Sequence, residues 1–218
     1  MYKRQYIRAD ARINEVYAHT DKLLVSHYPD PTKSRGQYLD LLELSIKEDP
    51  HCPRNAFYYA RELTFYKRWQ EAVTALNAYL ALPGATWLNE RCYAMRLLAK
   101  SHQALNNHSE SVKWARLACA EDPNIREPWV ELASIYYHQR QWHNCFSAAK
   151  TALDIKDKAL VYTMDPAVWG AVPHDLLAIS AYNLGLYDLA IKHGEIAVTF
   201  EPKDDRLANN LKFYQEKA

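Results

Sequence analysis

Small side chains recur along this chain at one constant spacing. Four times, a small residue is followed twelve positions later by a second one, and an aromatic residue or a histidine stands three positions before the second. The pairs are Ala60 with Ala72, Ala99 with Ser111, Ala133 with Cys145, and Ala178 with Ala190. Small side chains let two helices approach closely, and aromatic rings fill the wider gaps along the same seam. The spacing therefore predicts pairs of antiparallel helices that cross at these residues.

The third of these units begins with the pattern W-x2-L-A-x2-Y at residues 129–136. This is the opening of a tetratricopeptide repeat, with Ala133 in the place of the usual glycine. Proline follows the second helix of three units, at Pro83, Pro123 and Pro202, where it stops the helix because it lacks a backbone donor. Each pair can bury its apolar face only against its neighbours. The sequence predicts an all-α tetratricopeptide-repeat helical solenoid of about four helix pairs.

The units differ in length, which indicates insertions. The first small residues of successive units are 39, 34 and 45 positions apart, whereas the usual repeat has about 34 residues. The additional residues fall near 83–89 and, in greater number, within 156–173. We expect the longer insertion to project from one edge of the solenoid.

Single helices are predicted at both ends of the stack. Residues 34–48 predict a lone second helix, a leading half repeat with Leu39, Leu42 and Ile46 on one face. Residues 204–217 predict a C-terminal capping helix, because terminal repeats need a polar outer face.

Residues 1–33 do not follow the helical frame, so we expect a separate segment there and the solenoid over 34–218. The first five residues, Met-Tyr-Lys-Arg-Gln, are also what the end sequence of a library-preparation transposon encodes. We therefore expect these five residues to be artefactual and the natural protein to begin further upstream. A genuine start codon is the alternative.

Composition and charge narrow the class of protein. Hydrophobic residues make up 49% and charged residues 24% of the chain, as in a folded protein. The formal net charge of +1 indicates neither a nucleic-acid nor a membrane partner. The four cysteines are far apart and form no C-x-x-C pair. We expect a reduced, cytoplasmic protein with unpaired and mostly buried thiols.

The sequence offers no convincing catalytic or metal-binding pattern. His138 and His143 are five positions apart and flank a predicted turn, and the chain has neither an H-E-x-x-H motif nor a glycine-rich phosphate loop. Cys145 is assigned to a packing position, where a thiol is inert. We expect no catalytic residue, no metal and no cofactor in this chain.

The concave groove of the solenoid is the candidate binding surface, because the first helix of each repeat lines it. Groove residues are expected six, three or two positions before, and one or four positions after, the first small residue of each repeat. The groove residues predicted to bind a ligand at these offsets are Arg54, Tyr58, Arg61, Arg96, Lys100, Glu127, Glu131 and Tyr137. Arginine, lysine and aromatic side chains together suit an acidic peptide or a terminal carboxylate, on which Arg61 and Arg96 could converge. Salt bridges within the groove are the alternative.

Several segments resemble a family beyond the generic repeat. They are residues 27–30 and 33–43, 55–63, 126–130, and 169–170 with 173–176. These resemble the region that follows the catalytic domain in bacterial and phage family 2 glycosyltransferases with C-terminal tetratricopeptide repeats. The resemblance implies an upstream GT-A domain that binds a nucleotide sugar and a divalent metal through D-x-D. This chain contains no D-x-D, so the resemblance carries no catalytic residue over to it.

Two functions follow as hypotheses. In the first, residues 1–33 are the remnant of a glycosyltransferase domain and the repeats are its non-catalytic region, which acts in protein interaction, acceptor positioning or self-association. In the second, the chain is an independent peptide-binding scaffold. In both cases we expect the chain to be enzymatically inactive on its own.

Overall fold

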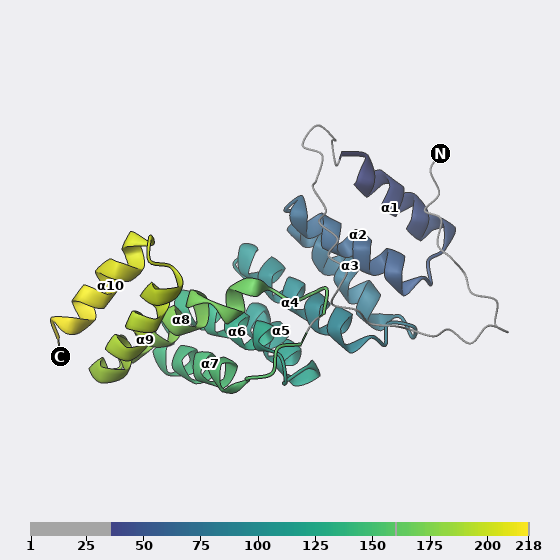
Figure 1. Ribbon diagram of the computed structural model, residues 1–218. Helices are drawn as coiled ribbons and strands as arrows, with labels where there is room; N and C mark the ends of the chain where they lie inside the picture. The colour runs from purple at the N-terminus through teal and green to yellow at the C-terminus, as the bar shows by residue number, and fades with distance from the viewer. Residues whose placement is uncertain (1–35, 160, 218) are drawn as a thin grey trace, which may run out of the picture. The chain divides into compact units, whose positions relative to one another are not determined.

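The computed structural model describes residues 36–159 and 161–217, and the regular structure of this part is entirely helical (Figure 1). The elements are α1 (Gly36–Glu48), α2 (Pro53–Phe65), α3 (Trp69–Ala81), α4 (Leu88–Ala104), α5 (His108–Glu121), α6 (Arg126–His138), α7 (Trp142–Asp154), the 3-10 helix η1 (Pro166–Trp169), α8 (Ala171–Asn183), α9 (Tyr187–Phe200) and α10 (Asp205–Gln215). The predicted all-α class is confirmed. The segment predicted over 1–33 lies outside the described residues.

The helices pack as successive pairs, α2 with α3, α4 with α5, α6 with α7, and α8 with α9. All eight small residues of the predicted frame have 0% exposure, which confirms that they lie where the paired helices cross. Ser111 fills its place with a hydrogen bond, since its Oγ donates to the carbonyl of Ala99 at 2.9 Å. The spacing of twelve therefore marks the seam of each pair.

The turn inside each pair has the same backbone conformation in all four units. Lys67, Asn106, Arg140 and Gly185 have φ angles of 57°, 60°, 56° and 76°, and each lies seven positions after the first small residue of its unit. Only glycine adopts this left-handed region without a steric penalty, which for other residues is roughly 1–2 kcal/mol. At Lys67 and Arg140 the turn is thus imposed by the packing of the helices, because these residue types disfavour it, whereas asparagine and glycine are common in this region.

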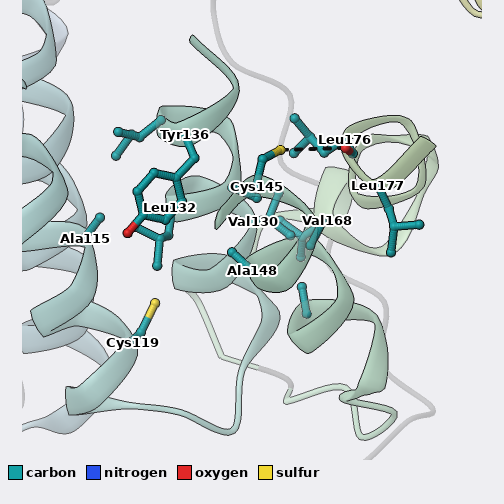
Figure 2. Close-up of a cluster of buried hydrophobic side chains, with 14 of the residues drawn as sticks. Ala115, Cys119, Val130, Leu132, Tyr136, Cys145, Ala148, Val168, Leu176 and Leu177 are labelled. Carbon is teal, nitrogen blue, oxygen red and sulfur yellow. Dashed lines mark hydrogen bonds between the residues drawn. The ribbon is translucent and has the colours of Figure 1, made fainter. Parts of the chain in front are cut away.

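The largest hydrophobic cluster joins consecutive pairs. Figure 2 shows Ala115 and Cys119 of α5 facing Leu132 and Tyr136 of α6, with residues of α7, η1 and α8 beyond them. The Sγ of Cys145 donates a hydrogen bond to the carbonyl of Leu176 at 3.7 Å, drawn as a dashed line. Each pair therefore contributes to a core that it shares with its neighbours, as expected of stacked repeats.

The cysteines are free thiols, as predicted, and three of the four are buried. Burial raises the pKa of the Cys92 and Cys119 thiols to about 12 and that of Cys145 to about 11. These thiols remain protonated near neutral pH, so they are packing residues rather than nucleophiles.

The end helices also match the prediction. Helix α1 packs against α2, with Leu39 and Leu42 buried. Helix α10 packs against α9 and α8, and buries Leu207 and Tyr214. The side chain of Asp204 caps α10 by accepting hydrogen bonds from the amides of Arg206 and Leu207.

The expectation that the long insertion projects from one edge is wrong. Residues 155–159 and 161–169, which we call the strap, run back along the N-terminal ends of α4 and α6. The phenol of Tyr162 donates a hydrogen bond to Glu90, 72 positions away, and the amide of Asp165 donates one to Glu127. Val168 of η1 is buried in the large hydrophobic cluster. The physical reason is that α4 and α6 present buried charged groups at this point, and the strap supplies their hydrogen-bond partners.

Candidate functional site

The first helices of the repeats form one continuous face. Helix α2 contacts α4, α4 contacts α6, α6 contacts α8, and α8 contacts α10, so the cap extends the row. We call this row the first-helix face. The eight predicted ligand-binding residues lie on its helices, but their surroundings divide them into three groups.

The first group is basic and aromatic and lies on α2 and α4. The guanidinium carbons of Arg54 and Arg61 lie 5.7 and 4.6 Å from the ring centroid of Tyr58, within the range of a cation–π contact. Within the described part of the chain, neither arginine forms an ion pair, and the Nε of Arg61 is buried without a hydrogen-bond partner. Lys100, on α4, is exposed.

The second group consists of groove residues that the protein itself pairs. The Nε of Arg96 lies 3.0 Å from a carboxylate oxygen of Glu131, and the two side chains are 10% and 23% exposed. The sequence predicts that Arg61 and Arg96 converge on one carboxylate of a ligand. In the structure, Arg96 already pairs with the carboxylate of Glu131. For this pair, the salt-bridge alternative describes the structure.

Replacing Arg96 with Met is expected to lower the free energy of unfolding by about 2 kcal/mol, because Glu131 then loses its partner in a partly buried place. The double variant Arg96→Met with Glu131→Met should lose less than the sum of the single variants, as measured by urea denaturation. The exposed pair of Lys113 and Glu110 provides the control, since Lys113→Met should cost less than about 0.5 kcal/mol. Strict additivity at Arg96 and Glu131 would contradict this assignment.

The strap accounts for Glu127, which is 4% exposed. Its Oε1 accepts the amide of Asp165 at 3.1 Å. The neighbouring Arg126 donates from Nε and Nη2 to the carbonyl of Ile155 at 2.9 and 2.8 Å, and from Nη1 to that of Val168 at 3.4 Å. Its guanidinium also lies 3.8 Å from the ring centroid of Trp169. The N-terminal end of α6 is therefore occupied by the chain itself.

The strap also covers the N-terminal end of α4. The hydroxyl of Tyr162 lies 2.5 Å from a carboxylate oxygen of Glu90, and its ring centroid is 5.2 Å from that of Trp87. Ala159 of the strap packs against the cluster that contains Cys92 and Met95. The strap thus covers part of the first-helix face that the offsets had assigned to a ligand.

The third group surrounds a hollow near the C-terminal end of the row. This pocket has a volume of about 710 Å³, within the range of ligand-binding pockets, and lies among α6, η1, α8 and α10. Tyr137 is the predicted residue that it contains. The lining residues are Ser134, Tyr137, His138, Pro166, Ala167, Gly170, Ala171, Val172, Asp175, Leu176, Ile179, Glu201, Asp204, Arg206 and Leu207.

Three carboxylates, of Asp175, Glu201 and Asp204, and the guanidinium of Arg206 line the pocket. The Nη1 of Arg206 lies 2.7 Å from Asp175, and its Nη2 lies 3.6 Å from Asp204. Burial raises the pKa of Asp175, and the hydrogen bond from Arg206 opposes this rise. Glu201 forms no ion pair with any other described residue.

The sequence could have indicated part of this pocket. Val172, Asp175, Leu176 and Ile179 stand six, three and two positions before and one position after Ala178. These are the same offsets that placed groove residues in the first three repeats. Arg206 carried no such signal, because it belongs to the cap helix rather than to a repeat.

Groups of three or more metal-binding side chains do not occur in the described part of the chain. Nor does any described helix have the length and apolar character needed to cross a membrane.

No protein-family model and no curated protein sequence matches this chain. Solved structures do match its fold. MamA has a TM-score of 0.62 at 14% identity, over 83% of this chain and 99% of MamA. YrrB, described as a TPR protein with an unusual peptide-binding site, has a TM-score of 0.62 at 11% identity, over 81% of this chain and 82% of YrrB. PilF of Pseudomonas aeruginosa has a TM-score of 0.61 at 14% identity, over 82% and 72% of the two chains. The tetratricopeptide-type solenoid is thus shown as the fold.

Proposed function

We propose that this chain is a protein-interaction scaffold that binds an extended segment of a partner protein on its first-helix face. The observation that carries the proposal is the 710 Å³ pocket, which the first helices of two repeats and the cap helix line together. Its lining combines apolar walls with charged and hydroxyl groups, a combination that suits a peptide side chain. The similarity of fold to YrrB, described as having a peptide-binding site, supports the proposal by analogy.

Because the strap covers the N-terminal ends of α4 and α6, we place the partner on the C-terminal part of the first-helix face. It already supplies partners to Glu90, Arg126 and Glu127, so a peptide would have to displace it to reach these groups. The pocket beside α8 and α10 requires no such displacement. The basic and aromatic residues of α2 and α4 remain a second contact region for the same partner.

A random library of displayed 12-residue peptides tests the proposal. We expect binding peptides to be enriched, and their affinity to fall at least tenfold in the variant Val172→Trp, because the indole would fill the pocket. Val172 is 41% exposed, so the fold can accommodate the change. Leu117→Trp is the matched control, since Leu117 is 40% exposed on the second helix α5. A library without binders, or binders that tolerate Val172→Trp, would refute the proposal.

A finer proposal places this scaffold in a family 2 glycosyltransferase, where it would position an acceptor or mediate self-association in the cytoplasm. Its support is the resemblance of residues 33–43, 55–63 and 126–130 to that family. The upstream DNA decides between this and an independent scaffold, because a reading frame that continues into a domain with D-x-D favours the first. Purified chain incubated with nucleotide sugars and Mn²⁺ should then show no turnover of its own.

A further inference from the structure

The acidic character of the pocket indicates what kind of partner it accepts. We propose that the pocket among α6, η1, α8 and α10 binds a basic segment of a partner protein, with an arginine or lysine side chain held between Glu201 and Asp175. This inference rests on the proposed function and adds the chemistry of the partner.

The first step is the balance of charge. Three carboxylates, of Asp175, Glu201 and Asp204, line the pocket together with one cation, Arg206. With three negative charges and one positive charge, these side chains give the pocket a net charge of −2. The side chain of Asp175 is only 17% exposed, whereas Asp204 is 38% exposed and Glu201 is exposed, so a cation in the hollow meets one carboxylate with little competing water and two that remain hydrated.

The second step is that the pocket already accommodates a guanidinium. Arg206 reaches Asp175 at 2.7 Å and Asp204 at 3.6 Å, while its own side chain is 57% exposed. The side chain of Asp175 is only 17% exposed. A carboxylate buried to this extent favours a cation beside it. The reason is that the less polar surroundings disfavour its negative charge unless a positive charge compensates it. Arg206 compensates only part of the negative charge.

The third step concerns the walls. Tyr137 and His138 line the pocket from α6, with their ring centroids 5.2 Å apart in an edge-to-face arrangement. Aromatic rings attract cations by their faces, and guanidinium groups stack on them well. Aromatic and carboxylate groups in one hollow favour an arginine or lysine side chain over a neutral one.

The fourth step is the choice of a protein as the partner. Beside the charged groups the pocket is lined by Pro166, Ala167, Val172 and Ile179, which offer apolar contacts to the residues that flank the cation. A small amine offers only its own methylene groups to these contacts, whereas a peptide also offers the residues beside the cation. An extended basic segment of a partner protein therefore matches both parts of the lining.

Fluorescence anisotropy with the full chain tests this inference. The probe is a fluorescein-labelled 11-residue peptide of alternating arginine and alanine, and peptides in which glutamate or glutamine replaces arginine are the comparisons. We expect only the arginine peptide to bind, and its affinity to fall as NaCl is raised. Glu201→Gln and Asp175→Asn should each lower this affinity about tenfold, which corresponds to the loss of one charge-assisted contact.

Arg206→Gln provides a change of opposite sign. It removes the competing cation, so the affinity for the arginine peptide should rise, by about threefold. Glu201→Gln keeps the proposal testable if Asp175→Asn perturbs the docking of α10, because Glu201 takes part in no internal ion pair among the described residues. Glu110→Gln on α5 is the matched control for loss of one exposed carboxylate and should leave binding unchanged.

The outcomes separate this inference from the proposed function. Glutamate or glutamine peptides that bind as tightly as the arginine peptide, and lose affinity in Val172→Trp, would overturn the basic partner but leave the scaffold function. Spermidine that binds as tightly as the peptide would overturn the assignment to a protein partner. An arginine peptide unaffected by both Glu201→Gln and Asp175→Asn would overturn the site.

Discussion

Replacing Arg126 with Met is expected to lower the free energy of unfolding by about 3 kcal/mol. Its guanidinium, in a residue 8% exposed, holds the carbonyls of Ile155 and Val168 and stacks on Trp169. Methionine keeps most of the side-chain volume but supplies none of these hydrogen bonds, so two strap carbonyls lose their donor. Urea denaturation measures the change in stability. Trypsin should also cleave after Lys156 and Lys158 of the strap faster than in the unmodified protein.

Arg68→Met is the control for this change. Arg68 forms an exposed ion pair with Glu71, and such pairs contribute little to stability. We expect a loss below about 0.5 kcal/mol and unchanged cleavage of the strap. If Arg126→Met and Arg68→Met had equal effects, Arg126 would not be the residue that anchors the strap.

The helix pairs were predictable because close packing leaves little freedom. The helix crossing at Ala133 and Cys145 excludes larger side chains. Small residues must therefore recur at each crossing, and they do so at a constant spacing. The same holds for the prolines that end the second helices. In these places the small size of a side chain, or the missing backbone donor of a proline, carries the structural information, and the sequence alone sufficed to assign the fold.

The strap was not predictable, because its contacts join residues without any periodic relation. Tyr162 and Glu90 are 72 positions apart, and a tyrosine in an irregular segment carries no sign of its partner. Glu127 stands at the offset of a groove residue, yet its carboxylate already accepts a hydrogen bond from the backbone amide of Asp165. Offsets identify the face on which a side chain lies, but they do not show what covers that face.

The left-handed turns illustrate a similar limit. Gly185 signals its conformation by residue type, whereas Lys67 and Arg140 occupy the same place without such a signal. Their conformation follows from the helices that they join. The pocket shows the reverse case, because the offsets applied to the fourth repeat identify Asp175 and Ile179, while the contribution of α10 depends on how the cap docks.

The crossing itself can be tested at Ala133. Replacing Ala133 with Leu is expected to lower the free energy of unfolding by about 3 kcal/mol, because the added carbons enter a seam where Ala133 and Cys145 both have 0% exposure. Relief requires the helices α6 and α7 to separate, which would also disturb the large hydrophobic cluster to which both residues belong. Thermal and urea unfolding, followed by the helical circular-dichroism signal, measure the loss.

Ala120→Leu is the matched control, since Ala120 is exposed on the helix α5 and the two residue types have similar helix propensity. We expect its stability to change by less than about 0.5 kcal/mol, with a normal folded signal. A change below about 0.5 kcal/mol at Ala133 as well would mean that the seam tolerates a leucine. In that case the spacing of twelve would not mark a close helix crossing, and the repeat frame would be wrong at this position.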